Sequence, residues 1–130
     1  MQTIVVKFGG SSLANAQQIR KAAAIINAKS ARRYVVVSAP GKVHAEDTKI
    51  TDLLYSCYDR AVAHEEYESV LKIIETRFAE IIKELDIELD LSEDFAALRH
   101  NLDTAPSADF AASRGEYLNA RVISTFLGYP

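Results

Sequence analysis

Two short runs of β-branched residues near the start of the chain constrain its fold most strongly. The first is Ile4-Val5-Val6 and the second is Tyr34-Val35-Val36-Val37, and neither alternates with polar residues. Such runs are typical of parallel strands that helices cover on both faces. Between them, residues 15–29 carry apolar side chains at helical spacing, and Asn15 is suited to cap that helix. The sequence therefore predicts strands near residues 2–8 and 34–39, joined by a helix in one βαβ unit.

The first predicted strand leads directly into Lys7-Phe8-Gly9-Gly10-Ser11-Ser12. Glycines let the backbone approach a ligand closely, and consecutive backbone N–H groups before a helix attract anions. Lys7 and the backbone of this loop are therefore candidates to hold phosphate. The alternative is an ordinary turn with a surface lysine. No lysine follows the glycines, so the P-loop pattern is absent.

The second predicted strand also ends in small and turn-forming residues, Ser38-Ala39-Pro40-Gly41. Open α/β sheets bind ligands at the carboxyl ends of their strands, so both loops are expected at one binding edge. Residues 42–49 are predicted to form a mobile polar loop of the kind in which binding residues collect. Thr48 or Thr51 is expected to cap the helix that follows.

The rest of the sequence is predicted to be helical. Residues 67–85 keep apolar side chains at helical spacing and form a long amphipathic helix. Ser92 is expected to cap a shorter helix that ends near Leu102. Pro106-Ser107 is predicted to start a last helix over residues 108–127, with Gly128 as its stop signal. The fold class is therefore α/β and rich in helix, with two parallel strands and about five helices.

Two strands make a small parallel sheet for so many helices. We therefore expect the chain to be the N-terminal part of a larger α/β domain, with a complete small α+β domain as the alternative. An unpaired strand edge and uncovered helix faces also predict association into a homo-oligomer.

Composition excludes several classes of partner. The 130 residues are 48% hydrophobic and 25% charged, as in ordinary globular proteins, and the net charge of -3 gives no electrostatic signature of nucleic-acid or membrane binding. The single cysteine, Cys57, excludes an internal disulfide and suits a reducing cytoplasm. The three histidines lack metal-ligand spacing and are expected at the surface. They are His44, His64 and His100.

Four blocks of sequence, in this order and spacing, resemble the aspartate kinases of the amino acid kinase fold. The similarity extends over essentially all 130 residues and covers the N-terminal half of the catalytic domain in that family. The blocks are Lys7-Phe8-Gly9-Gly10-Ser11-Ser12, Val36-Val37-Ser38-Ala39, Ile50-Thr51-Asp52-Leu53-Leu54, and Ser113-Arg114-Gly115-Glu116 followed by Leu118-Asn119-Ala120.

The resemblance implies a role for individual residues. Lys7 corresponds to the catalytic lysine on the transferred phosphate, and Phe8, Gly9, Gly10 and Ser11 form the phosphate-binding stretch around it. Ser38 and Thr51 correspond to positions that contact aspartate, and Glu116 to the glutamate that takes its α-amino group. No role transfers to Arg114.

Simpler interpretations of three of these residues stay open. Thr51 could serve only as a helix cap, and Ser38 could satisfy a backbone group at the strand end. Glu116 lies in an otherwise apolar helical stripe, where burial would require a cationic partner. Arg114, Arg121 or a lysine elsewhere in the chain could supply it.

The function implied by the resemblance is transfer of the γ-phosphoryl group of ATP, with Mg²⁺, to the β-carboxylate of L-aspartate. The product is 4-phospho-L-aspartate, in the first step of lysine, threonine and methionine biosynthesis. The family's ATP-binding half and ACT domains have no match here, so the chain is expected to be inactive alone and to hold no tightly bound cofactor. One alternative is a kinase of glutamate, acetylglutamate or a nucleotide monophosphate, and another is a non-catalytic oligomerisation module built on residues 67–85.

Overall fold

The computed structural model describes residues 2–129, which form two strands and five α-helices in the predicted order. Strands β1 (Ile4–Phe8) and β2 (Arg32–Val37) flank helix α1 (Ala16–Asn27) and pair in parallel, with Lys7 opposite Val36. The α/β prediction is confirmed, although β2 begins and ends two residues earlier than predicted. The other helices are α2 (Ile50–Val62), α3 (Glu68–Glu84), α4 (Ser92–Thr104) and α5 (Ala108–Leu127).

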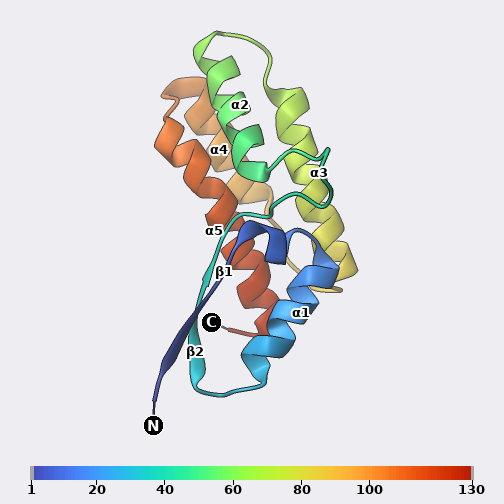
Figure 1. Cartoon of the computed structure of the whole chain (residues 1–130). Helices are drawn as coiled ribbons and strands as arrows, with labels where there is room; N and C mark the ends of the chain where they lie inside the picture. Colours follow the sequence, from blue (N-terminus) through green and yellow to red (C-terminus); the bar gives the residue numbers. More distant parts are fainter. Residues whose placement is uncertain (1, 130) are drawn as a thin grey trace.

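Helices α2 to α5 form a bundle at one end of the molecule, and the two strands lie with α1 at the other end (Figure 1). Helix α5 connects the two ends, since it contacts α2 and α4 in the bundle and β2 in the sheet. One hydrophobic core runs through both ends, from Leu13 and Ile19 near the sheet to Phe78 and Phe95 in the bundle. The ends of the strands therefore lie where the sheet meets the bundle.

Three predicted helix ends are confirmed. The side chain of Asn15 accepts a hydrogen bond from the backbone N–H of Gln18 at 3.0 Å, and Ser107 accepts one from Phe110 at 3.2 Å. Gly128 ends α5 in the left-handed conformation, with φ of 77°. Each of these signals is local, because a cap needs only the four or five residues around it.

Two other caps were predicted wrongly. The N-cap of α2 is Lys49, which makes no side-chain cap, so neither Thr48 nor Thr51 caps this helix. Ser92 lies inside the first turn of α4, and the carboxylate of Asp90 accepts its backbone N–H at 2.9 Å. Asp90 thus satisfies the free backbone N–H of Ser92 itself, and no side chain caps the start of α4.

The sheet is covered on one face only, although its strands were predicted to be buried on both. Phe8, Val35 and Val37 pack against side chains of α1 and α5. On the other face Val5 is 64% exposed, Tyr34 57% and Val36 47%, because no element among residues 2–129 packs there. The strands therefore have the sequence pattern of a sheet with helices on both faces. In residues 2–129, helices cover only one of these faces.

Other predictions concern single residues. Cys57 is buried in α2 as a free thiol, and the three histidines are exposed, as expected. A short 3-10 helix over Gly10–Leu13, which was not predicted, takes the chain from β1 toward α1. Across the part of the chain that the structure describes, no helix combines the length and apolar character needed to span a bilayer.

Candidate functional site

A cavity of about 540 Å³ lies beyond the carboxyl ends of both strands. Five of the eight predicted site residues line it, although they come from four separate parts of the chain. Gly10 and Ser11 lie in the 3-10 helix after β1, and Ser38 directly follows β2. Thr51 lies in the first turn of α2 and Glu116 in α5. They are Gly10, Ser11, Ser38, Thr51 and Glu116.

The close crossing of α5 over the end of β2 brings Glu116 to this edge. Gly115 is buried there, and a Cβ atom added to it would lie 2.8 Å from the Cβ of Ala39. Such a distance is shorter than real Cβ contacts, so the crossing requires glycine. The neighbouring residue in each segment, Glu116 in α5 and Ser38 after β2, reaches the same cavity.

The other three predicted site residues do not line the cavity. Lys7 is the next-to-last residue of β1 and is exposed, opposite Val36 on the uncovered face of the sheet. The side chain of Phe8 packs into the core, so only its main chain is available to a ligand. Gly9 has no heavy atom within 4 Å of the position that a Cβ would occupy, which leaves its backbone open to close approach.

Two glycines hold the loops after β1 and β2 against each other. The backbone N–H of Gly41 donates to the carbonyl of Gly10 at 2.8 Å. A Cβ on Gly41 would lie 2.6 Å from the carbonyl carbon of Gly10, so a larger residue would separate the loops. The turn-forming sequence after β2 signalled a loop here, but it did not indicate this contact.

The buried side-chain amide of Asn119 holds the end of β2 against α5. Asn119 in α5 is fully buried, and its Nδ2 donates to the carbonyl of Ser38 at 2.7 Å. Its Oδ1 has no hydrogen-bond partner among the described residues. The side-chain amide of Asn119 therefore serves mainly to satisfy the carbonyl of Ser38. Without this donor, burial of that carbonyl would be unfavourable.

Charged side chains that were not predicted as site residues also line the cavity. Lys42 and Lys49 lie at its wall, at the two ends of the polar segment 42–49 in the loop that follows β2. The signal for them was the polar composition of residues 42–49 at a strand edge. Inside this loop, Asp47 accepts the backbone N–H of Val43 at 3.1 Å, and this bond lowers the pKa of the Asp47 carboxyl.

Glu116 is exposed to the cavity rather than buried, so the expectation of a cationic partner was wrong. Within residues 2–129 it forms no ion pair. The guanidinium of Arg114 instead lies 4.5 Å from the ring centres of both Phe110 and Tyr117. Arg121 pairs with Asp94. The carboxylate of Glu116 is therefore available to an external cation.

The described residues contain no group of three His, Cys, Asp or Glu side chains placed to hold a metal ion. A divalent cation at this cavity would therefore need ligands from another source, such as nucleotide phosphates. The cavity itself offers main-chain N–H groups, hydroxyls, two lysines and one carboxylate. These groups suit a ligand that carries both anionic and cationic parts.

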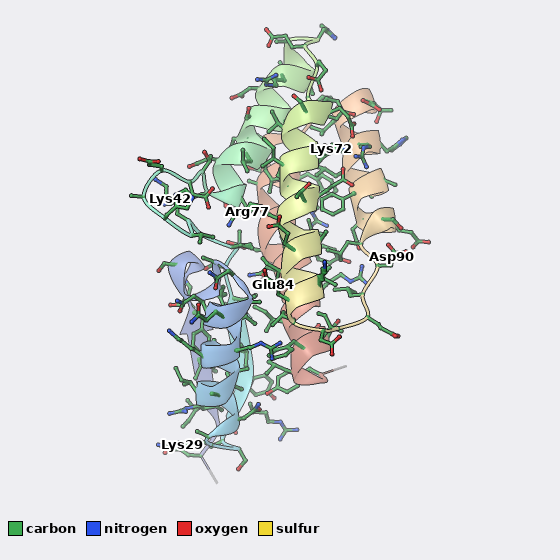
Figure 2. All side chains as sticks on the ribbon, turned by 90° about the vertical axis from the view of Figure 1, so that its right-hand side faces the viewer. Lys29, Lys42, Lys72, Arg77, Glu84 and Asp90 are labelled. Carbon is green, nitrogen blue, oxygen red and sulfur yellow. The ribbon has the colours of Figure 1, made fainter. Side chains whose placement is uncertain are left out.

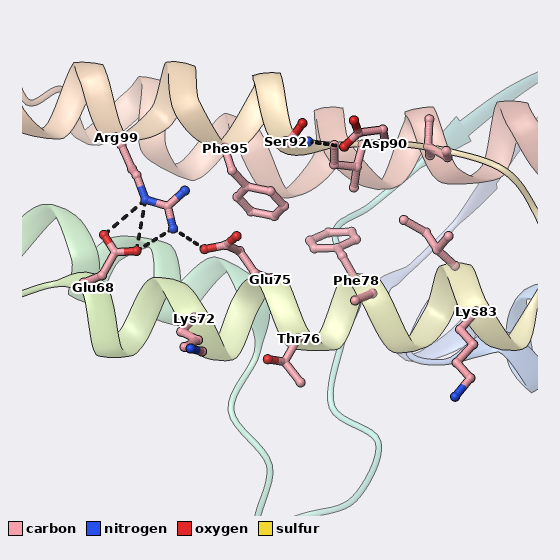
Figure 3. Close-up of a pocket in the computed structure, with 14 residues that line it drawn as sticks. Glu68, Lys72, Glu75, Thr76, Phe78, Lys83, Asp90, Ser92, Phe95 and Arg99 are labelled. Atoms are coloured by element: carbon pink, nitrogen blue, oxygen red, sulfur yellow. Dashed lines mark hydrogen bonds and ion pairs between the residues drawn. The ribbon is translucent and has the colours of Figure 1, made fainter.

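A larger groove, of about 660 Å³, runs between α3 and α4 (Figure 3). It contains none of the predicted site residues. Arg99 bonds to the carboxylates of Glu68 and Glu75 within it, and these bonds raise the pKa of Arg99. Phe78 and Phe95 form its floor and belong to the core. Because Arg99 and the two glutamates at its centre are already paired with each other, this groove is a weaker candidate for the functional site than the cavity at the strand ends.

The comparisons with known proteins agree on one family. The chain matches the amino acid kinase family over residues 2–129. It is 38% identical to aspartokinase 3 of Bacillus subtilis, over 96% of this chain and 29% of that protein. It is 29% identical to the chloroplastic bifunctional aspartokinase/homoserine dehydrogenase 2 of Arabidopsis thaliana, over 92% of this chain and 14% of that protein.

Solved structures show the same fold. The crystal structure of Clostridium acetobutylicum aspartate kinase superposes with a TM-score of 0.94 at 41% identity, over 98% of this chain and 30% of that one. Escherichia coli aspartokinase III, in complex with aspartate and ADP, has a TM-score of 0.72 at 23% identity, over 98% of this chain and 29% of that one, and supports the fold alone. The chain thus spans less than a third of the length of these relatives. It belongs to the amino acid kinase family, and the relatives that it matches over nearly its whole length are aspartate kinases.

Proposed function

We propose that this chain forms the aspartate-binding part of an aspartate kinase, which transfers the γ-phosphoryl group of ATP to the β-carboxylate of L-aspartate. The observation that carries the proposal is the cavity at the strand ends, where Ser38, Thr51 and Glu116 meet the glycine loop after β1. The 38% identity to aspartokinase 3 of Bacillus subtilis supports aspartate as the substrate.

In this proposal each wall of the cavity recognises one part of the substrates. The unpaired carboxylate of Glu116 binds the α-ammonium group of aspartate, and the hydroxyls of Ser38 and Thr51 bind its carboxylates. The loop after β1 faces the transferred phosphate through backbone N–H groups and the lysine at the strand end. Its residues are Lys7, Phe8, Gly9, Gly10 and Ser11.

The reaction needs positioning and positive charge more than proton transfer. The β-carboxylate, with a reference pKa of about 3.9, is already an ionised nucleophile at neutral pH. One of its oxygens forms a bond to the γ-phosphorus while the bond from that phosphorus to the bridging oxygen of ADP breaks. Lys7, Lys42 and Lys49 offset the repulsion between the two anions. Mg²⁺, brought with ATP, neutralises phosphate charge when it is bound.

Three further statements belong to the same proposal. Because the chain spans only 29% of aspartokinase 3 of Bacillus subtilis, residues 1–130 alone are expected to give no turnover. The protein is expected to form a homo-oligomer, and sedimentation velocity would test this by the absence of a monomer at high concentration. A cytoplasmic location agrees with the free, buried thiol of Cys57.

A chimera provides the test. Residues 1–130 replace the matching segment of aspartokinase 3 of Bacillus subtilis, and aspartyl phosphate is trapped as its hydroxamate. We expect aspartate-dependent turnover, and Glu116→Gln should raise the KM for aspartate by about tenfold or more, because a hydrogen bond between charged groups is lost. Glu93→Gln, an exposed change in α4 away from the cavity, is the matched control.

Three results would contradict the proposal. A chimera that prefers glutamate or acetylglutamate to aspartate would assign the cavity to another kinase of the family. A KM for aspartate that responds equally to Glu116→Gln and Glu93→Gln would remove Glu116 from the site. Hydroxamate formation by the 130-residue chain alone would refute the expected division of the active site.

A further inference from the structure

Arg77 links α3 to both of the loops that form the cavity wall, and its side chain points toward the loop that carries Lys42 (Figure 2). The Arg77 side chain is 13% exposed. Nη1 donates to the carbonyl of Thr48 at 3.0 Å, and Nη2 donates to the carbonyl of Gly41 at 2.8 Å and reaches that of Ala14 at 3.5 Å. The carboxylate of Asp47 lies 3.8 Å from Nη2.

The three carbonyl groups lie where the loops join the helices or contact each other. Ala14 directly precedes Asn15, the N-cap of α1, and Thr48 directly precedes Lys49, the N-cap of α2. Gly41 accepts from Arg77 through its carbonyl and donates to Gly10 through its N–H. A continuous line of hydrogen bonds therefore runs from α3 to Gly10 in the cavity wall.

Arginine is suited to this position because of its shape. The planar guanidinium presents five N–H donors in a fixed arrangement, so it can serve three carbonyls from two loops at once. A lysine ammonium has the same charge but cannot span the same acceptors. Arg77 is absent from the residues that line the cavity, so it acts on the site only through the loops.

We propose that Arg77 is a positioning residue that holds the loops after β1 and β2 in the relative placement that lets Gly10, Ser38 and Thr51 share one cavity. Its effect on catalysis rests on the proposed function, whereas its effect on the loops does not. The test therefore has one measurement for each.

The first measurement is hydrogen exchange of backbone amides in the 130-residue chain. We expect Arg77→Gln and Arg77→Lys to speed exchange of the Gly41 amide by about tenfold or more, because loss of a hydrogen bond from a charged donor favours local opening. Arg99→Gln is the matched control, since among residues 2–129 Arg99 bonds to Glu68 and Glu75 in the bundle and not to the loops. Exchange at Gly41 that is unchanged in the Arg77 variants, or that rises equally in the control, overturns the proposal.

The second measurement uses the chimera with aspartokinase 3. Arg77→Lys should raise the KM for aspartate by about tenfold, while Arg99→Gln leaves it within about twofold, since only the first variant displaces the cavity wall. A KM that Arg77→Lys leaves unchanged would mean that the charge alone is sufficient, which contradicts the proposal. If the unsubstituted chimera transfers no phosphate to aspartate, the proposed function fails, and exchange at Gly41 decides the role of Arg77 by itself.

Discussion

Substitution of Gly115 by alanine tests the close crossing that brings α5 to the end of β2. In most helices this change stabilises a protein, because alanine is favoured over glycine by about 1 kcal/mol. At Gly115 the new methyl group would lie 2.8 Å from the Cβ of Ala39, where ordinary contact begins at 3.4 Å. The two effects have opposite signs, so the sign of the result is informative.

The packing term is expected to be the larger of the two. Leu54 Cδ1 and Ile50 Cγ2 would lie 3.3 and 3.4 Å from the new methyl group, close to the ordinary contact distance. The Cβ of Ala39 cannot rotate away, so the backbone of α5 or of the strand end must shift. Such overpacking costs about 1–3 kcal/mol. We expect a net loss of about 1 kcal/mol and a fall in Tm of about 3–5 °C for a chain of this size.

A double-mutant cycle isolates the contact. Ala39→Gly removes the Cβ atom that collides, so in that background Gly115→Ala should raise the free energy of unfolding by about 1 kcal/mol, the helix propensity term alone. Urea denaturation followed by circular dichroism measures all four proteins. If Gly115→Ala stabilises the chain equally whether residue 39 is alanine or glycine, the crossing is looser than the structure indicates and the reasoning is wrong.

Three further predictions concern the loops and the buried thiol. Gly41→Ala should separate the loops after β1 and β2 and speed amide exchange at residue 41, whereas Gly9→Ala, with open space around it, should leave that exchange unchanged. Burial raises the pKa of the Cys57 thiol to about 11, above its ordinary value of 9.0, so the unfolded chain loses this proton first and stability should fall as pH rises above 9.0. Reaction of Cys57 with a thiol reagent at pH 8 should accordingly require unfolding. Because the pKa of Asp47 is lowered from 3.8, its contribution to stability is lost as pH falls, so the Tm difference between the natural chain and Asp47→Asn should shrink below that pH.

Local signals in the sequence predicted most of the fold. The apolar spacing of the helices and the β-branched runs of the strands gave the elements in the right order. Asn15, Ser107 and Gly128 marked helix ends correctly, because each acts on a backbone group within a few residues of itself. The glycine and serine residues after the two strands indicated the edge at which the cavity lies. All of these predictions depend on interactions between residues close together in the chain.

The features that only the tertiary structure decided depend on residues far apart in the chain. Arg77 looks like any polar residue of an amphipathic helix, and its bonds to Gly41 and Thr48 cross 36 and 29 positions of sequence. Gly115 gave no sign that Ala39 would lie against it. The exposure of Glu116, and of one face of the sheet, follows from which elements pack together. Periodicity tells which face of an element is apolar, but the partner of that face is set by the packing of the whole chain.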